Sequence, residues 1–305
     1  RWGDVWAGLY LALARFALVK LRRHAEAPRN WRPHILVFAG DASKRIGLVR
    51  LASWFNQNRG IVTVCRLIEA DLAGESIDIP AETAEMNRAI EREGLLAFGE
   101  VNVVADFEAG VVDVAQANGI AGLHSNTVMF GWSSQPRRRE SHLRMVRGLA
   151  KAGKSTLITR LDWRHEPGRE RRIDLWWGGL EHNGDMMLLL AYLLSLNAEW
   201  ADSRILIRTV ARSEEERAMQ EQGLEQLVPQ TRIPADAEVL TLPPGETLSR
   251  LIRSRSESAA IVFFGMKEPE AGGEAAYAAN MRQLVEGLAT VVFVHNAGRF
   301  AGRLI

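Results

Sequence analysis

Two stretches of the sequence, SNTVMFGW (residues 125–132) and AAIVFFGM (residues 259–266), follow one pattern and indicate the fold. Each is a short apolar run that ends in glycine followed by a large apolar residue, at the point where the chain would leave a strand. Such continuous apolar runs, placed between helical stretches, are typical of strands in a parallel sheet that is covered on both faces. The two stretches therefore predict an α/β protein in which one structural unit occurs twice.

Further runs of the same kind lie around both stretches, with longer helix-compatible segments between them. We expect strands at residues 34–39, 61–67, 101–104, 127–131, 156–161, 173–177, 204–210, 238–242, 260–264 and 290–294. We expect helices at residues 43–58, 81–94, 107–118, 139–152, 185–197, 214–227, 246–255 and 274–288. The sequence thus predicts two tandem five-stranded, mainly parallel sheets flanked by helices, with a linker helix at 1–30 and α/β subdomains at 31–168 and 169–305.

The composition excludes several classes of function. Among 305 residues, 38 Lys and Arg balance 37 Asp and Glu, and this balance provides no overall field that would gather a nucleic acid. The single cysteine, Cys65, lies in an apolar run and is expected to be a buried small hydrophobe. The seven histidines are scattered, and no clustered acid, base and nucleophile is found. The sequence therefore predicts neither an enzyme nor a metal site.

The first segment is predicted to be an amphipathic helix, with Asp4 as its N-cap and Pro28 beyond its end. Its apolar stripe consists of Trp6, Leu9, Leu13 and Phe16, followed by Leu21. Such a helix has no core of its own, so it is expected to lie on the globular body, on a partner chain or on a membrane surface. Arg15 and Lys20 interrupt its apolar run, which does not predict a membrane span. The chain starts without Met and is interpreted as a piece of a longer protein.

One motif matches a phosphate-binding loop in its letters only. Residues 148–155, GLAKAGKS, fit the pattern G-x-x-x-x-G-K-S. A phosphate-binding loop needs a strand before it and a helix after it, because the helix N-terminus supplies free N–H groups and a positive dipole end. Here a predicted helix comes first and a strand follows. Gly153 is therefore interpreted as a glycine that ends a helix.

Loops at the strand ends provide a candidate nucleotide cleft, because ligands of open α/β sheets bind beyond the carboxyl ends of the strands. Gly40-Asp41 follows the first strand and Gly131-Trp132-Ser133 follows the fourth, while Gly119 and Gly122 lie just before the fourth. Their backbone N–H groups would contact the phosphates. The alternative is that each glycine only permits a tight turn.

The second unit has a similar glycine-rich junction between its first strand and first helix. Gly178-Gly179 is followed by Asn183-Gly184-Asp185, in which Asn183 or Asp185 would cap the helix. A structural cap is the expected role, with an anion site as the alternative.

Longer segments resemble the cytoplasmic C-terminal domain of the cation–chloride cotransporter family. Residues 3–21 are similar to the long helix that leaves the last membrane span of that family, and NWRPHILVFAG (30–40) resembles the N-W-R-P start of its first strand. Residues 122–132 and 205–211 resemble later strands of that family, and residues 173–194, with the paired tryptophans, resemble its strand–loop–helix segment. These segments follow one another in the family's order.

The resemblance implies two universal-stress-protein-like halves, a homodimer, and an attached transmembrane transport domain at the cytoplasmic side of the membrane. It implies that Trp6, Leu9, Leu13 and Phe16 contact the partner helix or the body. It also implies that ATP or ADP, bound by some relatives, would lie at Gly40-Asp41 and Gly131-Trp132-Ser133, although here Trp132 replaces the Ser or Thr of the universal-stress-protein pattern.

The leading hypothesis is a non-enzymatic dimerisation and regulatory domain that modulates ion transport by the attached transmembrane domain, without a nucleic-acid partner. The alternative is a free-standing nucleotide-binding protein of the universal stress type.

Overall fold

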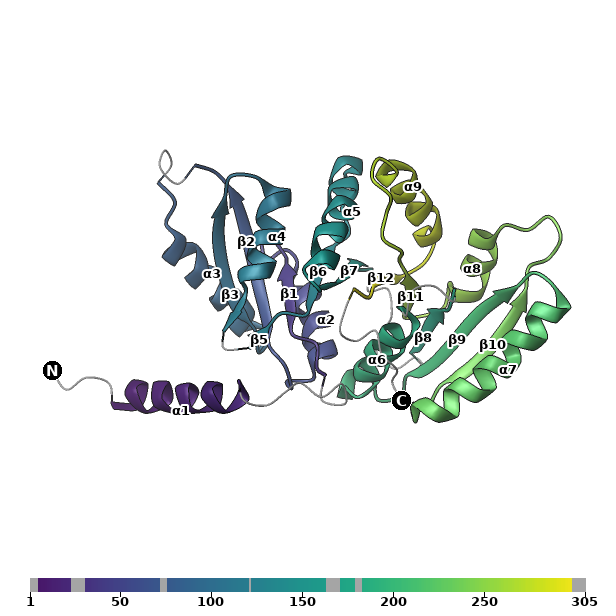
Figure 1. Ribbon diagram of the computed structural model, residues 1–305, viewed down its shortest axis with the longest axis horizontal. Coiled ribbons are helices and arrows are strands. Elements are labelled where there is room, and N and C mark those ends of the chain that lie inside the picture. The colour runs from purple at the N-terminus through teal and green to yellow at the C-terminus, as the bar shows by residue number, and fades with distance from the viewer. Residues whose placement is uncertain are drawn as a thin grey trace.

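The computed structural model describes residues 5–22, 31–71, 76–120, 122–162, 171–178 and 183–297, apart from the side chains of Leu227 and Gln230. In these residues ten strands form one sheet that crosses the molecule in the order β10-β9-β8-β11-β12-β7-β6-β1-β2-β3 (Figure 1). The strands of the first half are β1 (Ile35–Phe38), β2 (Val62–Glu69), β3 (Phe98–Val104), β6 (Thr127–Gly131) and β7 (Ser155–Arg160). Those of the second half are β8 (Arg172–Trp176), β9 (Arg204–Ala211), β10 (Asp236–Thr241), β11 (Ile261–Gly265) and β12 (Thr290–His295).

Helices cover both faces of the sheet. One face carries α2 (Ile46–Asn56), α3 (Ile79–Arg92), α6 (Asn183–Ser195) and α7 (Glu214–Thr231), and the short helix η2 (Ala198–Trp200) follows α6. The other face carries α4 (Phe107–Ala117), α5 (Pro136–Lys151), α8 (Leu248–Ser256) and α9 (Glu274–Val285), which stand in a row above the sheet in Figure 1. The helix α1 (Val5–Leu21) belongs to neither layer.

The apolar runs form strands because both of their faces find a core. In β1, Ile35 and Val37 point into the core beneath α2 and α6, whereas Leu36 and Phe38 point into the core beneath α4 and α5. All four residues of β1 are buried. This alternation explains why the central strands have no polar side of the kind that a half-exposed strand would show.

Side-chain caps fix where several helices begin. Asp78, Asp106, Ser213 and Thr247 each accept a hydrogen bond from the backbone N–H three residues later, at the starts of α3, α4, α7 and α8. Such a cap satisfies an N–H group that has no partner inside the helix.

The predicted class, two mainly parallel five-stranded units with flanking helices, is confirmed, but the two units share a single sheet. The strand order of the first half, β3-β2-β1-β6-β7, is repeated by β10-β9-β8-β11-β12. The two fifth strands, β7 and β12, pair antiparallel from Thr156↔His295 to Arg160↔Val291, whereas the other strand pairs of this sheet are parallel. The two halves are therefore joined through the edges that each unit would present alone.

Side chains strengthen this junction. Trp132 of the first half stacks on Phe293 of β12, with ring centroids 5.8 Å apart. Arg160 donates from Nη1 to the carbonyl oxygens of Val285 and Leu288, at 2.6 and 3.1 Å. Arg147 of α5 pairs with the almost buried Glu274 of α9 at 2.6 Å. The two halves thus form one packed body.

A short hairpin was not predicted. Strands β4 (Gly119–Ile120) and β5 (Leu123–His124) pair with each other between α4 and β6. The second half has no such pair at the corresponding place, since only Glu257–Ala260 separates α8 from β11 in the described chain. This hairpin is one difference in chain path between the two halves, and the short helix η2 of the second half is another.

Candidate functional site

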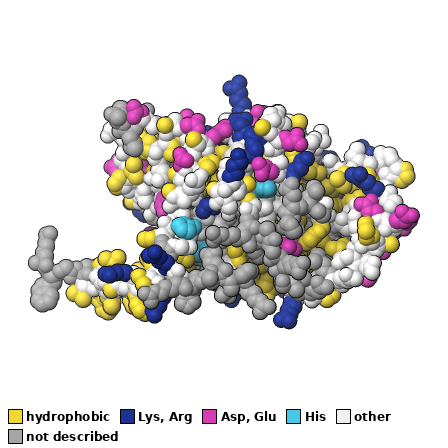
Figure 2. All heavy atoms as spheres, in the orientation of Figure 1, with side chains coloured by type: hydrophobic (Ala, Val, Ile, Leu, Met, Phe, Trp, Pro, Cys, Tyr) yellow, Lys and Arg dark blue, Asp and Glu magenta, His cyan; other side chains and the backbone are white. Residues whose placement is uncertain are grey.

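The helix α1 exposes its apolar side chains. None of its residues is buried by the described part of the chain, and the predicted contact residues Trp6, Leu9, Leu13 and Phe16 are 65%, 47%, 56% and 63% exposed. The helix extends away from the sheet in Figure 1, and yellow apolar side chains cover it in Figure 2. Docking on its own body, one of the three expected positions, is therefore not observed for residues 5–22.

The prediction of a single apolar stripe on this helix is wrong. Tyr10 and Leu11 lie outside the stripe and are 64% and 72% exposed, and Arg15 and Lys20 are the charged residues between Val5 and Leu21. A helix that is apolar on all sides is normally buried. The predicted cap Asp4 and the predicted stop Pro28 lie outside the described residues.

No helix in the described ranges combines the length and the apolar character that a membrane crossing demands.

The structure brings the predicted nucleotide-cleft residues to one edge of the sheet. Strands β1 and β6 are parallel neighbours, with Phe38 beside Phe130, so Gly40-Asp41 and Gly131-Trp132 leave the sheet next to each other. Gly40 has a left-handed backbone, with φ of +65°, which favours glycine. The carboxylate of Asp41 accepts hydrogen bonds from the N–H and hydroxyl of Ser43, at 3.1 and 2.6 Å. These bonds and the Lys44 ammonium lower the pKa of the Asp41 carboxyl to about 2.

The other loop of this pair is filled by its own side chains. Trp132 packs between Phe293 and the guanidinium of Arg139, whose centre lies 5.5 Å from the indole ring. Arg139 also donates to the carbonyl oxygens of Ser133 and Ser134, and the Ser133 hydroxyl accepts the N–H of Gln135. A space of about 10 Å³ remains beside Trp132, Arg139 and His142. Nucleotide binding at these loops stays a prediction.

Gly119 and Gly122 do not belong to this edge, which corrects their assignment to the cleft. They lie in the β4–β5 hairpin before β6, at the amino ends of the parallel strands, whereas Gly40 and Gly131 lie at the carboxyl ends. Both have positive φ angles, of +126° and +94°. In Gly119 a side chain would also collide with the backbone of Leu123 and His124, so the hairpin itself requires glycine there.

The phosphate-loop pattern at residues 148–155 has the structural role that was expected for it. Helix α5 ends before Gly153, which has φ of +69°, and β7 begins at Ser155. Lys154 is buried and donates from Nζ to the carbonyl oxygen of Ser125. The motif therefore ends a helix and ties it to the neighbouring loop.

The corresponding junction of the second half is structural as well. The Asn183 side chain donates to the carbonyl oxygen of Met266 at 3.0 Å and accepts the N–H of Asn296 at 2.7 Å. It thereby ties the end of β11 to the end of β12. Gly184 lies directly against the ring of Trp177, and a side chain there would overlap that ring. Of the predicted junction residues, Gly179 lies outside the described residues.

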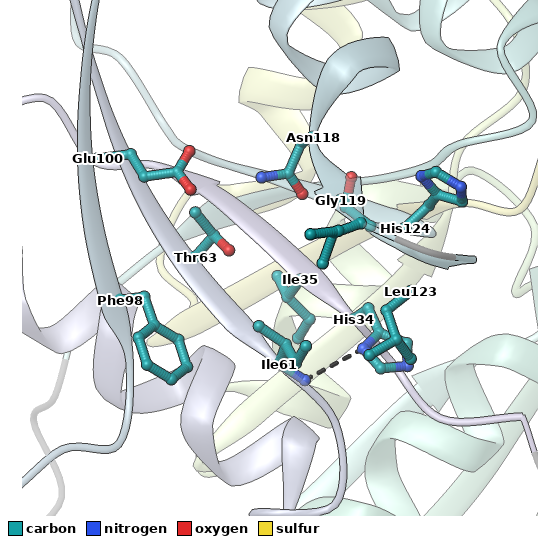
Figure 3. A pocket seen from close by; sticks show the side chains of 12 residues that line it. His34, Ile35, Ile61, Thr63, Phe98, Glu100, Asn118, Gly119, Leu123 and His124 are labelled. Atoms are coloured by element: carbon teal, nitrogen blue, oxygen red, sulfur yellow. Dashed lines mark hydrogen bonds between the residues drawn. The ribbon is translucent and has the colours of Figure 1, made fainter. Parts of the chain in front are cut away.

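Sequence reasoning missed a cavity of about 290 Å³ at the amino ends of the strands of the first half. Its walls come from the starts of β1, β2 and β3 and from the segment between α4 and β6 (Figure 3). Gly119 and Gly122, before β6, were the one signal of this cavity in the sequence. They were assigned instead to the cleft at the carboxyl ends of the strands. Polar and apolar groups both line the cavity.

Cys65 is buried in the core, as predicted. Burial raises the pKa of its thiol to about 12, with a smaller contribution from the nearby Glu100 carboxylate. The Asn102 amide donates to its sulfur at 3.5 Å. A thiol that stays protonated at neutral pH is a poor nucleophile, so Cys65 serves packing.

Comparison with known proteins agrees with the resemblance noted in the sequence. Residues 133–242 match solute carrier family 12. A solved structure of the cytoplasmic domain of a prokaryotic cation chloride cotransporter superimposes with a TM-score of 0.64 at 19% identity, covering 88% of this chain and 97% of that one. The predicted resemblance is thereby confirmed.

Two further solved structures share the fold. A universal stress protein from Archaeoglobus fulgidus DSM 4304 has a TM-score of 0.51 at 12% identity, covering 86% of this chain and 96% of the other. A protein of unknown function from Pseudomonas aeruginosa PAO1 has a TM-score of 0.53 at 12% identity, with coverages of 87% and 93%. The predicted universal-stress-protein-like architecture is thus confirmed at the level of the fold.

Proposed function

We propose that the chain is the cytoplasmic dimerisation and regulatory domain of a cation–chloride cotransporter-like transporter. The family match at residues 133–242 and the likeness to a prokaryotic cotransporter domain support this assignment. The observation that carries the dimer is α1, a helix of 17 residues of which the described body buries none. Burying one large apolar side chain contributes about 1.5–3 kcal/mol, so such a helix gains strongly from a partner.

The joined sheet supports the proposal that the dimer forms through this helix. Because β7 and β12 pair with each other, these two edge strands are no longer open to pairing with another chain. In the described chain the remaining sheet edges are β3 and β10, at opposite ends of the sheet. We assign the dimer contact to the face of α1 that carries Trp6, Leu9, Leu13 and Phe16.

The physical task of such a dimer would be linkage. A change in how two α1 helices cross would change the geometry of the attached transport domains, and the free energy of that change would bias them between states. This role is non-enzymatic and uses no small-molecule chemistry.

Sedimentation analysis of the whole chain tests the proposal. We expect a dimer for the natural sequence, and a dissociation constant at least about 100-fold higher for the double variant Leu9→Asp, Leu13→Asp, because both charges would enter the contact. The matched control is Leu11→Asp, Leu18→Asp. It adds the same charges on the side of the helix about opposite, since successive residues turn by about 100°.

The outcomes separate the claims. A chain that sediments as a monomer at its highest soluble concentration would refute the dimer. Equal weakening by both double variants would refute the assigned face. Flux measurements on the full-length transporter with Leu9→Asp, Leu13→Asp then test regulation, which predicts an altered transport rate at unchanged surface expression.

The loops at Gly40-Asp41 and Gly131-Trp132-Ser133 carry the second proposal, a nucleotide-binding role, because the fold places them side by side. Calorimetry with ATP tests this role on the natural chain and on Gly131→Val. A side chain at Gly131 would first meet Nη1 of Arg45 at 3.3 Å, a movable group, so the variant is expected to fold. Stoichiometric binding that the variant loses would favour this alternative.

A further inference from the structure

The cavity at the amino ends of β1, β2 and β3 has a polar wall and an apolar wall. The carboxylate of Glu100, the hydroxyl of Thr63 and the amide of Asn118 gather at one side in Figure 3, with Ile61 and Leu123 among the residues at the other. Glu100 is exposed, and no hydrogen bond or ion pair joins it to any residue in the described ranges. The cavity therefore presents a negative charge that the described chain does not neutralise.

The second half shows what the fold places at the same position. Fourth strands β6 and β11 begin with Thr127 and Ile261, which pair with Ile35 of β1 and Ile173 of β8. On the next strand, Cys65 of β2 pairs with Phe38 of β1, and Arg208 of β9 pairs with Trp176 of β8. Cys65 and Arg208 therefore occupy the same position in the two halves.

The third strands continue the same correspondence. Cys65 pairs with Glu100 of β3, and Arg208 pairs with Glu238 of β10. Glu100 and Glu238 are therefore the same position of the two halves.

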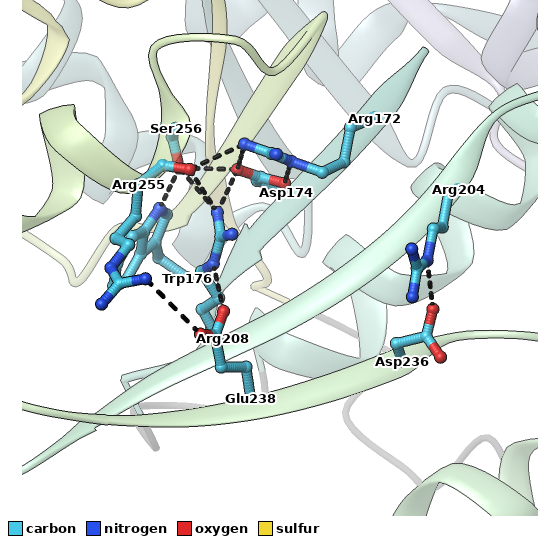
Figure 4. Close-up of polar contacts among 9 residues, drawn as sticks. All are labelled: Arg172, Asp174, Trp176, Arg204, Arg208, Asp236, Glu238, Arg255 and Ser256. Carbon is cyan, nitrogen blue, oxygen red and sulfur yellow. Dashed lines mark hydrogen bonds and ion pairs between the residues drawn. The ribbon is translucent and has the colours of Figure 1, made fainter. Parts of the chain in front are cut away.

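In the second half, arginine side chains neutralise that carboxylate (Figure 4). Arg208 donates from Nε to Glu238 at 3.0 Å, and Nη1 of Arg255 lies 3.9 Å from the same carboxylate. Arg208 also donates from Nη1 to the carbonyl oxygen of Arg255 at 2.8 Å, and Arg172 donates to that oxygen at 2.7 Å. A guanidinium here is thus held between a strand carboxylate and the carbonyl end of helix α8.

The first half keeps the strand carboxylate and the helix end of this arrangement, but it lacks the arginines, and Leu36 replaces the buried Asp174 that also binds Arg208. Cys65 replaces Arg208, and His34, which precedes Ile35, replaces Arg172. Helix α4 ends at Ala117 and has Asn118 as its C-cap, so its negative dipole end lies at the cavity wall. The Nδ1 atom of His34 accepts the N–H of Ile61 at 3.2 Å, which keeps this nitrogen free of a proton.

We propose that the cavity of the first half binds the guanidinium group of an arginine-like compound, at the place where the second half holds its own arginines. The carboxylate of Glu100 would accept the charged hydrogen bonds, as Glu238 does from Arg208. The Thr63 hydroxyl and the Asn118 amide oxygen would accept further N–H groups, and Ile61, Phe98 and Leu123 would cover the methylene stem. A planar group with five donors suits this set of acceptors better than a compact ammonium does.

Titration of the ¹⁵N-labelled whole chain with agmatine, followed by amide chemical shifts, tests the site. We expect saturable shifts confined to the segments that line the cavity, residues 34–35, 61–63, 98–100, 118–120 and 123–125. We also expect a dissociation constant about 10-fold higher in Glu100→Gln, since the charged acceptor is lost. The control is Glu85→Gln on α3, which removes an equal charge from an exposed residue that does not line the cavity.

A second titration, with the peptide acetyl-Gly-Arg-Gly-amide, distinguishes the source of the guanidinium. Binding of agmatine alone assigns the site to a free small molecule, and equal binding of the peptide assigns it to an arginine side chain. Absence of local shifts with both probes would overturn the proposal, as would equal affinity in Glu100→Gln and the natural chain. Neither result touches the dimer, because α1 takes no part in the cavity.

Discussion

The two halves of the molecule share one strand order but fill one position of their cores differently. In the second half, Asp174 is completely buried and accepts hydrogen bonds from Arg208, Arg172 and Ser256. In the first half, the corresponding strand positions hold Leu36 and Cys65, which pack in an apolar core. The order of apolar strands therefore sets this fold, whereas the interior at this place accepts either an ion network or apolar packing.

The largest effect is expected from breaking the ion network. Asp174→Leu gives the second half the residue of the first and leaves the guanidinium of Arg208, only 6% exposed, without its closest charge partner. We expect the free energy of unfolding to fall by about 3–5 kcal/mol, measured by urea denaturation.

The double variant Asp174→Leu, Arg208→Met is the control, because it removes both charges and keeps apolar volume. We expect it to recover most of the loss, since a well-packed apolar replacement of a buried ion pair is often neutral or stabilising. If the losses of unfolding free energy from Asp174→Leu and Arg208→Met simply add in the double variant, the two halves differ by more than this pair.

The next effect concerns a buried histidine that distinguishes the first half. His142 stacks on Phe130 at 4.8 Å, whereas Phe264, the counterpart of Phe130, stacks on Phe293. Burial, and then the charges of Arg138 and Arg45, lower the pKa of His142 from 6.5 to about 4.

The unfolded chain therefore binds a proton at a higher pH than the folded chain does. Stability is complete above pH 6.5 and falls as the pH drops toward 4, by about 3 kcal/mol in total. The variant His142→Leu should show a flatter profile in urea denaturation between pH 7 and pH 4. Identical profiles for the variant and the natural chain would contradict the assignment.

The smallest effect compares the glycines that end the two fourth strands. A side chain at Gly265 would come within 3.2 Å of Cβ of Asn183, which is held by two hydrogen bonds, whereas one at Gly131 would meet the movable tip of Arg45. We expect Gly265→Ala to cost about 1 kcal/mol and Gly131→Ala close to none, because only the first must displace a fixed group. Thermal unfolding of both variants measures the difference, and the reverse order would refute this explanation.

The strands could be predicted from the sequence because their apolar runs report burial on both faces. Residues 127–131 and 290–294 lie within or match β6 and β12 as the structure has them. The single sheet could not be predicted in this way. Pairing of Thr156 with His295 joins positions far apart in the chain, and an apolar run does not state which edge it will meet.

The candidate sites were predicted less completely than the strands. The order of strand and helix was enough to dismiss the motif at residues 148–155, and the strand ends brought Gly40 and Gly131 together. The cavity was missed because the importance of Glu100 is seen only when it is compared with Glu238, its counterpart in the second half. That correspondence depends on strand register. The exposure of α1 on all sides was missed because spacing selects a stripe and ignores the apolar residues outside it.

The antiparallel seam between β7 and β12 lets the two halves of the protein diverge in sequence. Arg160 of β7 pairs with Val291 of β12, and His295 of β12 pairs with Thr156 of β7. The two pairs occupy related positions on the two sides of the seam. Two identical subunits joined in this manner would receive every substitution twice, once at each related position. Covalent fusion removes that restriction, so one half can gain a charge or a binding group while its twin preserves the scaffold.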